Sequence, residues 1–105
     1  MGTTQSSNRV PFLERLKQDE PLLCDGAMGT LLHRRGAAID ACFEALNLTN
    51  PDLLVSVHRE YIEAGSRLIE TNTFGATRHN LETYGLANQI VEVNQAAVAH
   101  VQQAI

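Results

Sequence analysis

The chain has 105 residues, of which 44% are hydrophobic and 19% charged, and this composition is typical of one small globular domain. It excludes a disordered chain, a collagen helix and a coiled coil. Eight Lys and Arg against twelve Asp and Glu give a net charge of −4, and the basic residues are scattered apart from Arg34 and Arg35. The absence of a cationic face in this pattern argues against a nucleic-acid partner.

Residues 1–9 are polar, and we expect them to form a disordered leader rather than a signal peptide. No later segment approaches the ~18 consecutive apolar residues of a membrane span. Cys24 and Cys42 belong to no Cys-x-x-Cys pair, which favours free thiols in a reducing compartment. The sequence therefore predicts a cytoplasmic protein without a membrane partner, in which both cysteines pack as small buried apolar side chains.

The first half of the chain predicts one strand among short helical pieces. Pro11 suits the first turn of a helix, and Pro21 opens an apolar run that Gly26 ends. The expected elements are a short helix (11–17), a buried strand (22–25), a Gly-rich loop (26–30), a short helical stretch that stops near Gly36, and an irregular segment or single turn (39–46).

The second half predicts a longer helix, a second strand and a final helix. Asn50 can cap a helix that starts at Pro51, Asp52 complements its positive end, and Gly65 supplies a left-handed stop. The expected elements are a helix (51–64), a strand (67–71), a polar loop (72–75), a short helix to Tyr84 that ends at Gly85, and a helix from about residue 88.

Apolar residues at helical spacing predict the buried faces of the two long helices. For the first helix these are Leu53, Leu54, Val57, Tyr61 and Ile62. For the final helix they are Ile90, Val91, Ala97, Val98, Val101, Ala104 and Ile105.

The order strand, helix, strand, helix predicts an α/β fold with parallel strands. A (βα)8 TIM barrel needs roughly 250 residues, so this chain would supply the first two βα units of such a barrel, incomplete as given. Two parallel strands alone leave both edges unpaired. A small open α/β domain is the alternative.

Polar residues follow each predicted strand, at the end of a parallel sheet where binding sites form. Asp25 can pair with an ammonium group, while Gly26 lets the backbone approach a carboxylate. Thr30 or Thr73 can add a hydroxyl donor. Together these groups suit a zwitterionic small molecule. The alternative is that Asp25, Asn72 and Thr73 are turn formers that bond their own loops.

Two motifs then resemble the start of the homocysteine S-methyltransferase family. The first is Asp25-Gly26-Ala27-Met28-Gly29-Thr30, and the second is Glu70-Thr71-Asn72-Thr73-Phe74-Gly75-Ala76. Between them, Ala45-Leu46-Asn47-Leu48, Asn50-Pro51, His58, Tyr61 and Glu63-Ala64-Gly65 keep the family's order and spacing. The resemblance covers residues 10–105 and is closest to the homocysteine domain of cobalamin-dependent methionine synthase and to bacterial fusions with methylenetetrahydrofolate reductase.

The resemblance implies an enzyme with a zinc-dependent (βα)8 barrel that transfers a methyl group to the sulfur of homocysteine. It implies a substrate site in which Asp25 holds the amino group of homocysteine and the backbone at Gly26 and Ala27 takes its carboxylate. Thr30, Asn72 and Thr73 would line the same pocket. It leaves the methyl donor open among methyltetrahydrofolate through cobalamin, S-methylmethionine and S-adenosylmethionine, and favours the donor linked to folate and cobalamin.

The family's zinc cysteines are expected beyond residue 105, so no metal ligand is assigned to this chain. Its histidines have no metal-binding spacing and are assigned structural or surface roles; they are His33, His58, His79 and His100. The chain alone is therefore expected to be inactive, as an N-terminal fragment that needs the remaining barrel segments or a second chain to cover its strand edges. The alternative is a stand-alone binding or edge-pairing module without catalysis.

Overall fold

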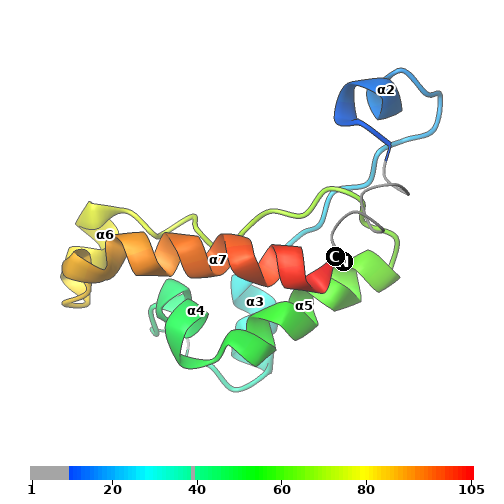
Figure 1. Ribbon diagram of the computed structural model, residues 1–105. Helices are drawn as coiled ribbons and strands as arrows, with labels where there is room; N and C mark the ends of the chain where they lie inside the picture. Colours follow the sequence, from blue (N-terminus) through cyan, green and yellow to red (C-terminus); the bar gives the residue numbers. More distant parts are fainter. Residues whose placement is uncertain (1–9, 39) are drawn as a thin grey trace.

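The computed structural model describes residues 10–38 and 40–105, so the predicted leader and Ile39 lie outside the described residues. Helices dominate the structure (Figure 1). In chain order they are α2 (Phe12–Leu16), α3 (Gly29–Arg34), the 3-10 turn η1 (Phe43–Ala45), α4 (Leu46–Thr49), α5 (Pro51–Glu63), α6 (Arg78–Thr83), the 3-10 turn η2 (Ala87–Gln89) and α7 (Ile90–Ala104). Within the described ranges, no helix has the length and apolar character needed to cross a membrane.

The long helices α5 and α7 lie side by side and form the body of the fold, whereas α2 stands apart from it (Figure 1). As predicted, α5 begins with Pro51 in its first turn. The backbone of Gly65 has φ +117°, the left-handed stop expected after this helix. The predicted capping bond is wrong, because Asn50 occupies the cap position without a side-chain bond to the helix.

The core lies where α3, α4 and α5 meet. Leu32, Leu54 and Val57 are fully buried there, and Phe43 and Tyr61 pack against them. The helix α7 covers another side of α5 with a buried face made of Val93, Ala97, His100, Val101 and Ala104. The predicted face of α7 is therefore partly wrong: Val91 and Val98 are exposed. The spacing of apolar residues predicted the wrong orientation for this helix, because its buried face includes the polar residue His100.

The two predicted strands meet through one parallel bridge, between Cys24 and Leu68. The amide of Asp25 donates to the carbonyl of Leu68 at 2.9 Å, and the amide of Arg67 donates to the carbonyl of Leu23 at 2.8 Å. The parallel direction agrees with the prediction, but the described residues hold no strand beyond this bridge. The two βα units are thus not confirmed as such.

The expected burial of the first strand is wrong. Leu23 and Cys24 are exposed, so Cys24 does not pack as a buried apolar side chain. Among the described residues, each of the two bridged segments pairs only with the other. Two paired strands without further neighbours form a sheet of marginal stability, with little to cover its faces. Cys42 is half-buried, and both thiols are free, as predicted.

Two histidines are buried without hydrogen-bond partners between α5 and α7. Both ring nitrogens of His58 and Nδ1 of His100 lack a partner among the described residues. Burial lowers the pKa of both rings. For His58 the nearby carboxylate of Asp25 opposes that shift, and His100 adds to it. The assignment of His58 and His100 as structural residues therefore fits their positions, whereas His79 is exposed.

The two buried histidines predict that the folded state loses stability at acidic pH. Burial favours the neutral form of both rings in the folded state, while the unfolded chain protonates them near the ordinary pKa of 6.5. The unfolded state then binds more protons as the pH falls below that value. The free energy of unfolding should decrease from about pH 6.5 toward the lowered folded pKa, by at most about 1.4 kcal/mol per pH unit for each histidine.

Urea unfolding of the full-length protein between pH 7.5 and 5.5 measures this slope. His58→Leu should reduce the slope, and His79→Gln, on an exposed site, should leave it unchanged. Equal slopes in the wild type and His58→Leu would contradict the prediction.

Candidate functional site

Asp25 lies half-buried at the end of the parallel bridge. Its two carboxylate oxygens each accept the backbone N–H of Glu70 at 3.2 Å, and the thiol of Cys24 lies 3.8 Å from one of them. Asp25 thus bonds the second extended segment rather than its own loop, unlike the turn former of the alternative interpretation. The structure thus brings Asp25, at the end of the first predicted strand, into direct contact with Glu70 of the second.

The loop after Asp25 is packed against two aromatic rings. A Cβ on Gly26 would lie 3.4 Å from the hydroxyl oxygen of Tyr61, and a Cβ on Gly29 would lie 3.2 Å from the ring of Phe43. The close approach that these glycines permit is therefore made by side chains of this chain. The N–H groups of Gly26 and Ala27 donate to no other group in the described part of the chain, and both residues are exposed.

The hydroxyl of Tyr61 holds this loop on α5. It donates to the carbonyl of Ala27 at 2.6 Å. Tyr61→Phe removes that bond and should lower the free energy of unfolding by about 0.5–1.5 kcal/mol. Thermal unfolding of the full-length protein measures the loss. Tyr84→Phe is the control, since Tyr84 is exposed. Equal effects of the two substitutions would contradict a stabilising role for the Tyr61 bond.

The predicted polar loop (72–75) begins with a buried residue, Asn72, which is 6% exposed. Its side-chain amide donates to the carbonyl of Phe43 at 3.1 Å and to the side-chain oxygen of Asn47 at 2.9 Å. Thr73 instead shares a hydroxyl contact of 2.8 Å with Thr71. Thr30 is exposed in the first turn of α3. The donors of Asn72 are thus engaged within the chain, whereas Thr30 remains open to solvent.

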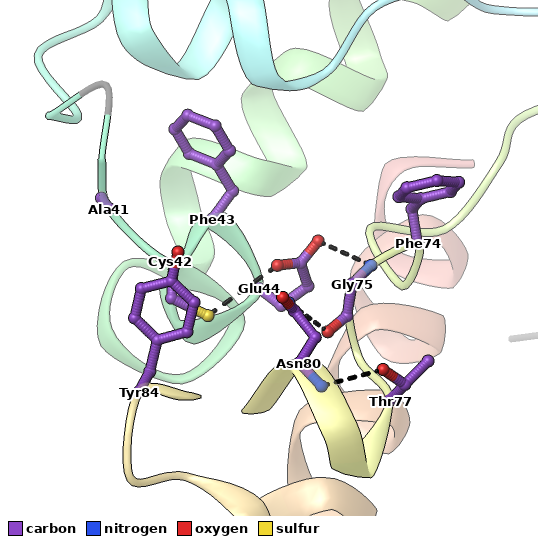
Figure 2. Close-up of a pocket in the computed structure, with 9 residues that line it drawn as sticks. All are labelled: Ala41, Cys42, Phe43, Glu44, Phe74, Gly75, Thr77, Asn80 and Tyr84. Atoms are coloured by element: carbon purple, nitrogen blue, oxygen red, sulfur yellow. Dashed lines mark hydrogen bonds between the residues drawn. The ribbon is translucent and has the colours of Figure 1, made fainter. Parts of the chain in front are cut away.

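A shallow pocket of about 450 Å³ lies beside this segment (Figure 2). The carboxylate of Glu44, from η1, accepts the backbone N–H of Gly75 at 2.9 Å, and the side-chain amide of Asn80 donates to the carbonyl of Gly75 at 2.8 Å. Phe74, at the rim, is 99% exposed. Sequence reasoning missed Glu44 and Asn80, because their partners lie on a distant loop and no local pattern marks them.

The family model for homocysteine S-methyltransferase matches residues 22–105. The chain belongs to the homocysteine S-methyltransferase family. This confirms the resemblance inferred from the two sequence motifs. The two motifs begin at Asp25 and Glu70, just after the bridged residues Cys24 and Leu68, so the family pattern and the contact between Asp25 and Glu70 concern the same part of the fold.

Individual relatives agree with the family assignment. The chain is 44% identical over 100 residues to the methionine synthase of Mycobacterium leprae (strain TN), a match that covers 90% of this chain and 8% of that protein. It is 43% identical over 81 residues to the methionine synthase of Mycobacterium tuberculosis (strain ATCC 25618 / H37Rv), covering 71% and 7%. The chain therefore spans less than a tenth of the length of these methyltransferases.

A solved structure supports the fold of this family member. The crystal structure of the homocysteine methyltransferase MmuM from Escherichia coli, in its oxidized form, superposes with a TM-score of 0.76 at 32% identity. The match covers 89% of this chain and 32% of that one. The helices and the bridged segments described here thus share an arrangement with part of a homocysteine methyltransferase.

One group of side chains has the composition of a metal site. The ligand atoms of Cys24, Asp25 and Glu70 lie within 4.8 Å of one another. Desolvation and the charges of the two carboxylates raise the pKa of the Cys24 thiol. The Asp25 oxygens already accept the N–H of Glu70. Zinc sites in proteins draw on several cysteines or histidines, so this group of one thiol and two carboxylates does not fit the zinc that the family resemblance implies.

Proposed function

We propose that this segment forms the homocysteine-binding part of a homocysteine S-methyltransferase and acts within a (βα)8 barrel. The observation that carries the proposal is the family match over residues 22–105, which includes both motif loops. Support for the barrel comes from the parallel bridge and from the similarity to the Escherichia coli enzyme. In that architecture both loops lie at the face where substrates bind.

The chemistry of the first loop suits an α-amino acid. The carboxylate of Asp25 offers a charge-assisted bond to an ammonium group. The N–H groups of Gly26 and Ala27, which have no partner within the described ranges, offer two donors to the substrate carboxylate. Thr30 and Thr73 would add hydroxyl donors, and Asn72 would set the wall of the pocket through its buried amide.

In this proposal the methyl group moves to the sulfur of homocysteine and yields methionine. The role of the present residues is to bind and orient the amino acid. The zinc implied by the resemblance would require ligands other than Cys24 and Cys42. The methyl donor in this proposal is one linked to folate and cobalamin, and the two mycobacterial relatives are named methionine synthases.

Calorimetric titration of the full-length protein with L-homocysteine tests the proposal. L-Homocysteine should bind, and L-homocysteine methyl ester, which has no carboxylate, should bind at least about tenfold more weakly because hydrogen bonds to charged groups contribute about 1.5–3 kcal/mol. Absence of homocysteine binding, or equal affinity for the ester, would overturn the proposed mode of recognition.

An edge-pairing module without catalysis is a second candidate, favoured by a groove of about 900 Å³ beside the bridge. The groove is lined in part by Leu22, Leu23, Leu68 and Ile69 from the two extended segments. We propose that further strands of the same barrel cover it. Immunoblotting of the source cell for the native polypeptide distinguishes the two: a band several-fold above 11.5 kDa supports the barrel, and a band at 11.5 kDa supports the module.

A further inference from the structure

Residues 42–47, which we name the brace, touch both motif loops. The ring of Phe43 packs on Gly29, and the carbonyl of Phe43 accepts the side-chain amide of Asn72. Asn47 donates to the carbonyl of Asn72 at 3.0 Å and to that of Val93, in α7, at 3.2 Å. The brace thus connects the loop after Asp25, the loop after Glu70 and the body of the fold.

Glu44 is the acidic residue of the brace, and it is only 9% exposed. The ion pairs found in the described ranges, Lys17 with Glu14 and Arg35 with Glu60, do not include it. Its oxygens are instead bonded by the N–H of Gly75 and approached by the thiol of Cys42 at 3.8 Å. Burying a carboxylate is costly unless neighbouring donors compensate it, so this geometry depends on the Gly75 N–H.

The contact at Gly75 leaves no room for a side chain. A Cβ there would lie 2.8 Å from both carboxylate oxygens of Glu44 and 2.6 Å from the amide nitrogen of Asn80. Asn80 holds the carbonyl of the same residue (Figure 2). The backbone of Gly75 is therefore bonded on both sides, its N–H by Glu44 and its carbonyl by Asn80, and its position is tightly defined.

We propose that Glu44 is a positioning residue for homocysteine. By fixing Gly75 it sets the backbone of Thr73 and Phe74 relative to the loop of Asp25, so the two loops keep the spacing that the amino acid needs. This inference rests on the proposed function. It differs from a purely structural role because it predicts a loss of substrate affinity in a folded enzyme, with little change in turnover at saturating homocysteine.

Four variants of the full-length protein test the inference: Glu44→Ala, Glu44→Gln, Gly75→Ala and the Glu44→Ala/Gly75→Ala double variant. Glu44→Ala should raise the Kd and the KM for homocysteine on the order of tenfold, with kcat within about threefold of the wild type. Glu44→Gln should restore most of the affinity, because its amide oxygen can still accept the Gly75 N–H. Glu82→Ala is the control, since Glu82 is exposed on α6.

Gly75→Ala should weaken binding as Glu44→Ala does, because the new methyl group overlaps the same carboxylate. The double variant should lose less affinity than the sum of the two single losses, since removing Glu44 relieves that overlap. If Glu44→Ala does not fold, Gly75→Ala alone serves as the disrupting variant.

The outcomes distinguish the proposed homocysteine-binding function from the positioning role of Glu44. A wild-type protein that does not bind homocysteine overturns the proposed function, and the inference with it. A wild type that binds, together with unchanged affinity in Glu44→Ala or in Gly75→Ala, overturns the inference alone. Equal losses in Glu44→Ala and Glu44→Gln also contradict it, because the second variant keeps the acceptor.

Discussion

Asp25→Asn in the full-length protein is expected to raise the Kd for homocysteine about 10- to 150-fold, the equivalent of about 1.5–3 kcal/mol. The substitution removes the negative charge that would pair with the substrate ammonium. It keeps one oxygen that can accept the N–H of Glu70, so the contact between the two motif loops is preserved in part. The metal content should not change.

Calorimetry with L-homocysteine measures this loss, and thermal unfolding verifies that the variant is folded. Asp19→Asn provides the matched control, because Asp19 is exposed and belongs to neither motif. If Asp25→Asn bound homocysteine as tightly as the wild type, Asp25 would serve only to bond the second extended segment.

Leu54→Ala is expected to lower the free energy of unfolding by about 2–5 kcal/mol. Leu54 is fully buried on α5 and belongs to the cluster with Leu32 and Val57. Truncation removes apolar contacts and leaves a cavity that the surrounding helices fill only in part. Because Phe43 packs against the same cluster, the brace should lose support as well.

Urea unfolding followed by far-UV circular dichroism measures the effect. Leu13→Ala is the control, since Leu13 is 69% exposed on α2, and it should cost less than about 0.5 kcal/mol. A loss below about 1 kcal/mol for Leu54→Ala would show that this cluster is not the core of the protein.

The helices were predictable because their signals are local. Pro51 and Gly65 delimit α5 within two residues of the predicted bounds, and Gly85, with φ +72°, follows the short helix α6 as expected. The family was predictable because each of its two motifs is an unbroken run of residues that can be recognised in the sequence. The roles of Asp25, Gly26, Ala27, Thr30, Asn72 and Thr73 in binding stay predictions.

Other features depend on distant partners and could not be predicted in this way. The apolar run before Asp25 predicts a buried strand, but burial requires neighbouring strands, and Cys24 forms only one bridge. His58 and His100 are polar residues on buried helix faces, so hydrophobic spacing overlooks them. Glu44 acquires its role only when folding places Gly75 against it, 31 positions along the chain.

The most direct test is methyl transfer by the native full-length polypeptide. It is incubated with L-homocysteine and, in turn, with methyltetrahydrofolate plus cobalamin, S-methylmethionine or S-adenosylmethionine, and methionine is quantified by mass spectrometry. The proposed function predicts methionine that depends on homocysteine and on one of these donors, with a higher KM for homocysteine in Asp25→Asn. A full-length protein that forms no methionine with any donor and does not bind homocysteine would contradict it.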